Sequence, residues 1–187
     1  MSEHSQVTRF MEAARRVGSE VHEFSSLAEA VQYIAEKAGG TTLVPETPLC
    51  RKHNLSNLLQ RASVAVHAGS YRQAGHFPAA GVTFSNFAMA DTGTIVLEST
   101  DETLRLATTL PERHFVLVDP RTILSDNLAA AAPMTLLHQG SQPVFVAYIT
   151  GPSRTADIER VLTIGCHGPR ELHILVVESI SDDLMEN

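Results

Sequence analysis

The residues best suited to chemistry lie in a turn that begins at Gly151. An apolar stretch, 143–149, runs into this turn, and apolar residues at helical spacing follow it. This pattern predicts a strand, a tight loop and a helix whose first turn contains Ser153, Arg154 and Thr155. The free amides and the dipole at a helix N-terminus attract anions, and Arg154 adds a full positive charge. We therefore expect the turn to bind a phosphate or carboxylate; the alternative is an ordinary helix cap with Arg154 paired on the surface.

A second polar turn contains Cys166, His167 and Gly168 and precedes an apolar strand pattern at 172–177. The two turns would then flank one crossover between neighbouring strands. A histidine in such a turn can act as an acid, a base or a ligand, so we interpret His167 as a candidate catalytic residue and Gly168 as a candidate ligand contact. The alternative is a turn histidine that hydrogen-bonds to backbone. Adjacent side chains seldom face each other, so the sequence gives little support to a Cys166 thiol mechanism.

A third group is the sequence Asp91-Thr92-Gly93. It matches the catalytic turn of aspartic proteases, but there is one copy, and the surrounding alternation of helices and strands contradicts an all-β protease. Two interpretations stay open. Asp91 is a catalytic acid–base group with Thr92 and Gly93 binding the ligand, or it caps an ordinary glycine turn.

The sequence lacks the usual metal and nucleotide motifs. It has nine histidines, but none forms the His-Glu-x-x-His string of zinc hydrolases, so we expect no metal site. Its two cysteines, Cys50 and Cys166, cannot build a zinc ribbon or an iron–sulfur cluster, and so few thiols favour a reducing, cytoplasmic setting. Neither the dinucleotide Gly-x-Gly-x-x-Gly pattern nor a Walker sequence occurs.

Composition limits the partners. The formal net charge is −7 and aromatic residues make up 5%, which disfavours nucleic acid and anionic membranes. No apolar run approaches the roughly 20 residues that span a bilayer. A chain of 187 residues suits one domain, which we assign to residues 1–187, with 1–40 as its N-terminal helical part.

The pattern of elements predicts an α/β fold with a three-layer, mostly parallel sheet covered by helices on both faces. Capping signals stand at Ser26, Ser99 and Asp119, the last followed by proline. Ligands of such sheets bind beyond the carboxyl ends of the strands, where we expect the loops at 69, 91, 151 and 168. The expected helices are 6–17, 27–38, 54–61, 100–110 and 120–132, and the expected strands are 41–44, 64–66, 81–84, 94–97, 115–118, 143–149 and 172–177.

Two stretches, 81–97 and 151–169, resemble the LUD-domain family, and within it the lactate-utilisation protein C (LutC or YkgG-like) group. The second stretch is the more specific. The first usually carries Glu-Thr-Gly in this family, whereas this chain has Asp91-Thr92-Gly93, which keeps the charge but shortens the side chain by one methylene. The resemblance implies a fold similar to the NagB, RpiA and CoA-transferase superfamily.

The resemblance also implies a role in a three-component system that oxidises L-lactate to pyruvate. Two of its components would hold iron–sulfur clusters, and this chain would be their companion, without a cofactor of its own. In this hypothesis the chain binds a small anionic ligand or a partner surface. The alternatives are a stand-alone enzyme acting on a phosphorylated or CoA-linked metabolite, with Asp91 or His167 as acid–base group, and a scaffold without a ligand.

Overall fold

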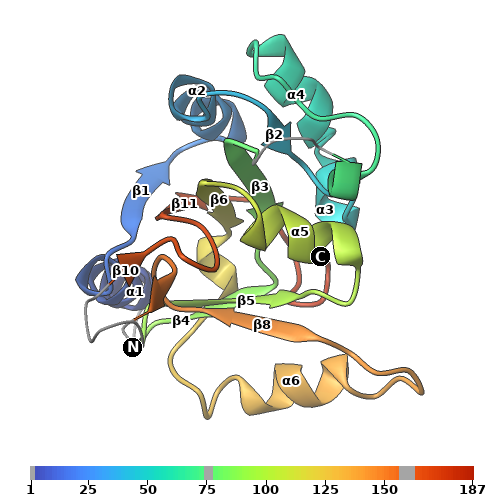
Figure 1. Cartoon of the computed structure of the whole chain (residues 1–187). Helices are drawn as coiled ribbons and strands as arrows, with labels where there is room; N and C mark the ends of the chain where they lie inside the picture. Colours follow the sequence, from blue (N-terminus) through green and yellow to red (C-terminus); the bar gives the residue numbers. More distant parts are fainter. Residues whose placement is uncertain (1–2, 74–77, 156–162) are drawn as a thin grey trace.

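The computed structural model describes residues 3–73, 78–155 and 163–187. Its larger sheet has five strands in the order β1-β11-β6-β3-β2, and all of its neighbours are parallel (Figure 1). The central strands are buried on both faces, which explains their continuous apolar sequences. The strands are β1 (Glu20–Phe24), β2 (Thr42–Leu43), β3 (Ala80–Phe84), β6 (Arg113–Val118) and β11 (Glu171–Val177).

Three helices cover one face of this sheet: α2 (Leu27–Lys37), α3 (Pro48–Lys52) and α4 (Leu55–Arg61). The capping signal at Ser26 is confirmed, because its hydroxyl accepts a hydrogen bond from the backbone N–H of Glu29 at 3.4 Å. The apolar side chains of α2 and α4 pack with Phe84, Phe115 and Leu175 into one core cluster.

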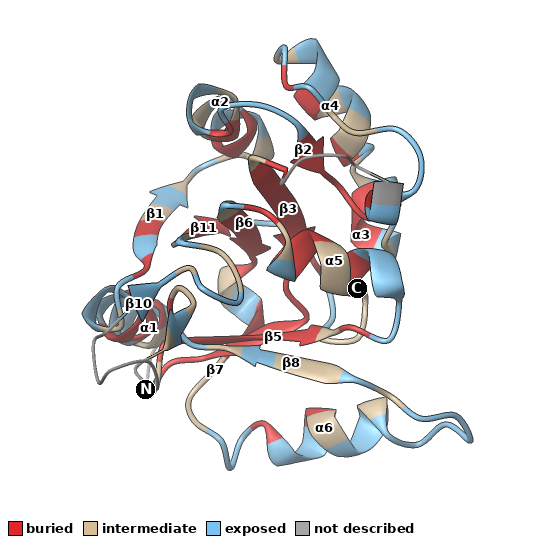
Figure 2. Ribbon diagram, in the orientation of Figure 1, coloured by how far each residue is buried: buried red, intermediate tan, exposed pale blue. Residues whose placement is uncertain are grey.

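The opposite face is covered by two helices and a smaller sheet (Figures 1 and 2). Phe10 and Ala14 of the first helix pack with Ile95 of the smaller sheet against Val116 and Ile174. The helices are α1 (Glu3–Arg16) and α5 (Glu102–Thr109), and the smaller sheet has the order β7-β4-β5-β8, formed by β7 (Ile123–Leu124), β4 (Phe87–Met89), β5 (Thr94–Glu98) and β8 (Val146–Ile149).

Helix α6 (Ala131–Leu137) packs on the outer face of the smaller sheet. Figure 2 shows the strands at the centre as the most buried part of the molecule and α6 as largely exposed. The α/β fold with a mostly parallel central sheet is therefore confirmed. The remaining short elements are η1 (Tyr71–Gln73), η2 (Pro120–Thr122), β9 (Arg154–Thr155) and β10 (Thr163–Ile164).

The expected crossover between 143–149 and 172–177 is wrong. Strand β8 pairs antiparallel with β5 in the smaller sheet, whereas β11 lies in the larger one. The expected helix start at Ser153 is also wrong, because Arg154 and Thr155 form β9, which pairs with β10. The rest of that expected helix, 156–162, lies outside the described residues.

Three further expectations, the cap at Ser99, the helix at 120–132 and the strand at 64–66, differ from the structure. The cap of α5 is Asp101, whose carboxylate accepts from the N–H of Thr103 at 2.6 Å, while the Ser99 hydroxyl donates to the carbonyl of Phe145. Asp119 caps the short helix η2, and α6 begins later, at Ala131. Residues 64–66 contribute one isolated bridge, between Val66 and Thr42. The sequence analysis missed β1, which separates α1 from α2 within the segment 1–40.

The carboxyl edge of the larger sheet, where we expected a ligand, is covered by the chain's last residues. The side chain of Asn86 donates to the carbonyl of Asn187 at 2.9 Å, and the Asn187 side chain donates to the carbonyl of Phe84 at 2.7 Å. At the end of β6, the buried carboxylate of Asp119 accepts from the backbone N–H groups of Ile180 and Ser181 at 2.8 and 3.0 Å. These bonds hold residues 180–187 against the strand ends.

Of the helices in the described ranges, none combines the length and the apolar character that crossing a membrane requires.

We predict that Asp119→Asn lowers the free energy of unfolding by about 2–4 kcal/mol near pH 7, because a buried, hydrogen-bonded carboxylate facing Arg121 is replaced by an amide. Burial raises the pKa of Asp119, but hydrogen bonds from Arg121 and the N–H of Ser181 outweigh it and hold the pKa below its usual value. In the unfolded chain the pKa of an aspartate is about 3.9. The contribution of the Asp119 carboxylate to the free energy of unfolding is therefore complete above that pH, and it is lost as the pH falls through the pKa of Asp119 in the folded protein.

Urea titrations at pH 7 and at pH 3 measure this difference, with Glu23→Gln as a surface carboxylate control. The difference in the free energy of unfolding between wild type and Asp119→Asn should be smaller at pH 3 than at pH 7. An equal gap at both pH values would contradict the account.

Candidate functional site

The candidate site is a cavity of about 260 Å³ between α5, β8 and the two polar turns of the sequence analysis. It lies at the amino ends of β6 and β11, where the N–H of Arg170 donates to the carbonyl of Glu112 at 2.8 Å. The expectation of a site at the carboxyl edge is therefore wrong for this cavity. Its lining consists of Thr108, Thr109, His114, Ala147, Tyr148, Ile149, Thr150, Gly151, Pro152, Ser153, His167, Gly168, Pro169 and Leu172.

Four of the predicted site residues line this cavity together: Gly151, Ser153, His167 and Gly168. Backbone bonds join their two turns, from the N–H of Ser153 to the carbonyl of Pro169 and from the N–H of Gly165 to the carbonyl of Ser153, both at 2.9 Å. A Cβ added to Gly168 would lie 3.2 Å from the Cβ of Ser153, so glycine permits this close approach. The proximity of the two turns is confirmed, and the chemical roles of Ser153 and His167 stay predictions.

Arg154 and Thr155 do not join that group. The guanidinium of Arg154 lies beside Gly18 and Gly151, near the end of α1, and it is not among the cavity-lining residues. Thr155 pairs with Thr163 in the β9–β10 hairpin. The expected helix amides at residues 153–155 are therefore wrong, because the backbone at 154–155 is extended, while anion binding by Arg154 and Thr155 stays a prediction.

Asp91, Thr92 and Gly93 form the turn between β4 and β5, outside the cavity lining. A chain of hydroxyls connects the turn to the cavity, since Thr92 lies 2.7 Å from Thr94, and Thr94 lies 2.8 Å from the cavity residue Thr150. One carboxylate oxygen of Asp91 is sealed from solvent and has no hydrogen-bond partner among the described residues. Asp91 therefore lies outside the cavity that His167 lines, and a direct joint role in catalysis is not supported.

Gly93 and Gly151 both serve packing against α1. Gly93 has φ +67°, and a Cβ there would lie 2.3 Å from the backbone nitrogen of Ala14. Gly151 has φ +78°, and a Cβ there would lie 2.3 Å from the carbonyl oxygen of Val17. Left-handed backbone and contacts this short require glycine. These two glycines therefore bring the hairpin turn against the C-terminal half of α1 and the cavity turn against Val17, the residue that follows the helix.

A second hollow, of about 520 Å³, adjoins the cavity and shares Thr109, His167 and Gly168 with it. Its other lining residues include the exposed Cys166 and the ion pair between Arg170 and Glu112, whose nearest charged atoms are 3.7 Å apart. His167 therefore stands between the two hollows.

His114 is a cavity residue that the sequence analysis missed. It lies on β6, is 1% exposed, and its Nε2 is 2.9 Å from the hydroxyl oxygen of Thr83 on β3. Burial lowers the pKa of His114 to about 3, and the nearby His173 adds to the effect, so the ring is neutral near pH 7. The available signal was a polar residue within the apolar strand 113–118.

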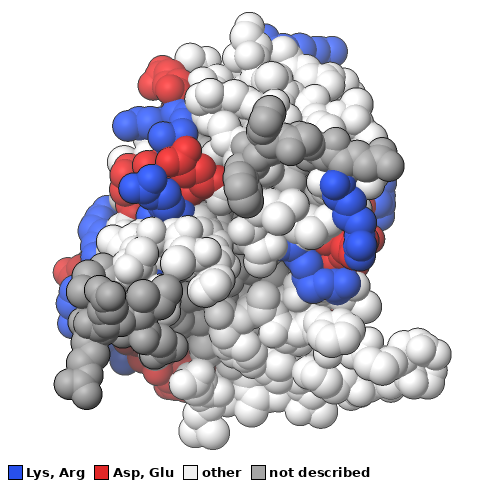
Figure 3. Space-filling view, in the orientation of Figure 1, with Lys and Arg blue, Asp and Glu red and all other residues white. Residues whose placement is uncertain are grey.

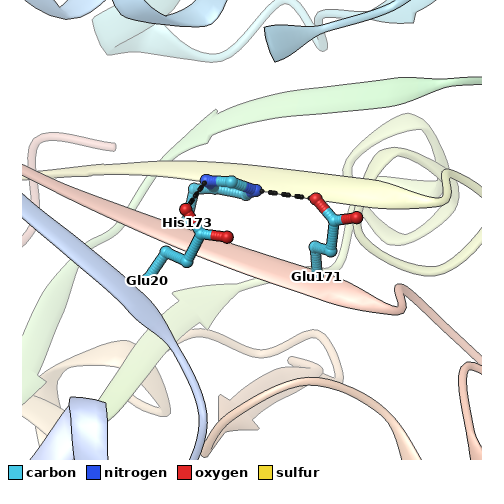
Figure 4. A group of neighbouring side chains, drawn as sticks. All are labelled: Glu20, Glu171 and His173. Carbon is cyan, nitrogen blue, oxygen red and sulfur yellow. Dashed lines mark hydrogen bonds and ion pairs between the residues drawn. The ribbon is translucent and has the colours of Figure 1, made fainter.

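A separate cluster joins Glu20, Glu171 and His173 at the amino ends of β1 and β11 (Figure 4). The ring of His173 is buried, and its Nε2 lies 3.2 Å from Glu171 while its Nδ1 lies 2.9 Å from the Tyr33 hydroxyl and 3.5 Å from Glu20. Figure 4 shows the two carboxylates at opposite nitrogens of the ring. Burial lowers the pKa of His173, and the bond to Glu171 opposes that shift.

This cluster offers atoms that a metal could bind, since one from each residue lies within 4.8 Å of the others. However, the guanidinium of Arg113 donates to Glu171 at 2.9 Å, and its positive charge opposes a cation there. Burial raises the pKa of Tyr33 to about 12, with the charge of Glu20 adding to it, so its hydroxyl stays protonated and can donate. We therefore interpret the cluster as a hydrogen-bond network that joins α2 to the sheet.

The cavity itself suits a small polar anion. Its lining contains Ser153 and Thr150 and no Asp or Glu, whereas the hydroxyls of the lining residues Thr108 and Thr109 donate to the carbonyl of Arg105 within α5. His167, at the exposed side of the cavity, has a ring N–H that could donate a hydrogen bond to a negative group. The floor, at Leu172 and His114, is buried and uncharged.

We predict that the folded protein reacts with one equivalent of a thiol reagent at Cys166, which is exposed, and that Cys50 reacts only after unfolding. Burial raises the pKa of the Cys50 thiol, which further suppresses its thiolate. Ellman titration before and after denaturation should count one and two thiols, and Cys166→Ser should leave none in the native state. Two native thiols in the wild type would contradict the described packing of α3.

Comparison with known proteins places the chain among relatives. A family model described as the LUD domain matches residues 7–177. A protein named Lactate utilization protein C from Geobacillus thermodenitrificans is 34% identical over 166 residues, which cover 82% of this chain and 69% of that protein. The protein of the same name from Geobacillus kaustophilus is 33% identical over 159 residues, which cover 77% of this chain and 65% of that protein. The chain thus spans about two thirds of the length of these relatives.

The crystal structure of a DUF162 family protein from Deinococcus radiodurans has a similar fold, with a TM-score of 0.64 over 95% of this chain and 99% of that chain. At 20% identity, this likeness concerns the fold alone. The match to the family model covers nearly the whole chain, and relatives above 30% identity share most of it. This chain therefore belongs to the LUD-domain family.

Proposed function

We propose that this chain acts in lactate utilisation, as the cytoplasmic companion of iron–sulfur subunits that oxidise L-lactate to pyruvate. The observation that carries the proposal is the identity of 33–34%, over most of the chain, to proteins named Lactate utilization protein C. The chain's two cysteines lie far apart in sequence, one buried and one exposed, so clusters would belong to the partners. In this proposal the chain holds no cofactor of its own.

We assign the ligand of this subunit to the cavity at the amino edge. A lining of hydroxyls without carboxylates, with a histidine at the exposed side, favours a small carboxylate such as lactate or pyruvate. Ser153 would hydrogen-bond the carboxylate, and His167 would pair with it. The hollow beside Cys166 gives room for a larger molecule, which supports the alternative of an enzyme for a phosphorylated or CoA-linked metabolite.

A subunit also needs a docking surface, and the lower part of the molecule offers one. The segment 127–153 contains no Lys, Arg, Asp or Glu, although charged residues make up 19% of the chain. Figure 3 shows the region of α6 and β8 as uncharged. We name its exposed apolar residues the α6–β8 face: Leu128 (85% exposed), Leu136 (52%), Phe145 (58%) and Tyr148 (49%).

Exposed apolar side chains with few charges around them are typical of interaction sites. A charge lies close to this face, since the Arg105 guanidinium is 5.3 Å from the centroid of the Phe145 ring. Strand β8 is also an edge strand of the smaller sheet. The α6–β8 face therefore supports binding to another subunit, and we assign that place to an iron–sulfur partner.

We predict that deleting the gene abolishes growth on L-lactate and that the wild-type gene restores it. Leu136→Glu should fail to restore growth and should reduce co-purification of the iron–sulfur subunits by about tenfold or more, because it places a charge in an apolar interface. Gln60→Glu, which adds the same charge on exposed α4, should behave as wild type. Unchanged lactate growth after deletion would refute the functional proposal. Normal co-purification of Leu136→Glu would refute the docking surface alone.

We further predict that L-lactate or pyruvate, at a hundredfold its dissociation constant, adds about 2.7 kcal/mol to the free energy of unfolding. In a thermal-shift assay this corresponds to roughly 5–10 °C. Ser153→Ala and His167→Ala should each weaken the shift, and His138→Ala, at the exposed histidine that follows α6, should not. Stabilisation by coenzyme A but not by lactate or pyruvate would favour the alternative enzyme.

A further inference from the structure

The floor of the cavity carries a polar group whose presence the proposed function does not explain. On the same face of the larger sheet, the neighbours of His114 along β6 and β11 are apolar, among them Val116, Leu172 and Ile174. A histidine buried to 1% exposure in such surroundings loses most of its hydration, which costs free energy unless its nitrogens are hydrogen-bonded.

One ring nitrogen of His114 has a hydrogen-bond partner among the described residues, and the other has none. Nε2 lies 2.9 Å from the Thr83 hydroxyl oxygen, while no described residue hydrogen-bonds to Nδ1. The described side-chain atoms that are both sealed from solvent and unpaired belong to Ser19, Asp91 and Asn187. Nδ1 of His114 is not among them, and His114 is one of the residues that line the cavity, so the cavity is where a ligand could reach this nitrogen.

The charge state of this ring limits what it can recognise. Because burial holds the pKa of His114 near 3, the imidazole stays neutral and cannot balance a carboxylate. A neutral ring nitrogen can donate to or accept from an uncharged oxygen, and the Thr83 hydroxyl, which can itself donate or accept, is compatible with either tautomer of the ring. The floor therefore complements a hydroxyl or a carbonyl, while the exposed side, with Ser153 and His167, complements the anionic end.

We propose that Nδ1 of His114 hydrogen-bonds the hydroxyl or keto oxygen of a 2-hydroxy or 2-oxo acid whose carboxylate faces Ser153 and His167. This inference rests on the proposed function and makes His114 the residue that distinguishes such acids from plain carboxylic acids. Thr83 is then a positioning residue, because it acts through the ring.

Calorimetric titration of the full chain with L-lactate and with propionate tests the inference, since propionate has the same carbon skeleton without the hydroxyl. Wild type should bind L-lactate about tenfold more tightly than propionate, the ratio expected for one buried hydrogen bond. In the double variant Thr83→Val/His114→Leu the affinities for L-lactate and propionate should differ by no more than about twofold. The change should come from weaker binding of L-lactate alone. Removing both partners leaves no unpaired hydroxyl, so the variant should fold.

Two comparisons separate the outcomes. Ser153→Ala should weaken the binding of L-lactate and of propionate by similar factors, because it acts on the carboxylate that both acids share. The ratio of their two dissociation constants should therefore stay near ten. Unchanged propionate binding in the double variant shows that its cavity is intact. If the double variant keeps the wild-type ratio, or loses propionate binding as well, the inference is wrong and the proposed function stands. If wild type binds neither acid, the inference falls together with the proposed ligand.

Discussion

The parallel pairing of β6 with both β3 and β11 is the constraint on which the site depends. Its register sets His114 opposite Gly81 on one side and Leu172 on the other. Gly81 has a second consequence, because a Cβ there would lie 2.0 Å from the carbonyl oxygen of Ala107, so α5 can rest directly on the sheet. The floor of the cavity and the helix beside it are thus fixed by the same three strands.

Helix α1 holds the other side of the site in place. The turn of Gly93 meets its C-terminal half and the turn of Gly151 meets Val17, the next residue after the helix, at distances that exclude any Cβ. The stretches 81–97 and 151–169, which carry the family resemblance, therefore contain glycines whose role is packing. The polar residues near these glycines have different positions: Ser153 and His167 line the cavity, whereas Arg154 lies beside the end of α1. These two stretches of the chain thus combine residues that shape the site with residues that line it.

Much of the fold could be predicted because the signals were local. The strands near 81–84, 115–118 and 172–177 are continuous apolar runs, and the Ser26 cap is set by residues three positions apart. The position of the site could not be predicted, because it depends on the pairing of β8 with β5, far away in sequence. That pairing moves the turn at Gly151 from an expected crossover to the amino edge of the larger sheet. His114 was missed because one polar residue inside an apolar strand gives no sign of the cavity that it faces.

The most direct test of the account is a crystal structure of the protein soaked with L-lactate. We predict electron density for the acid in the cavity between α5 and β8, with its carboxylate near Ser153 and His167 and its hydroxyl near His114. Lactate bound instead at the carboxyl edge of the larger sheet, beside Asn86 and Asp119, would contradict the account.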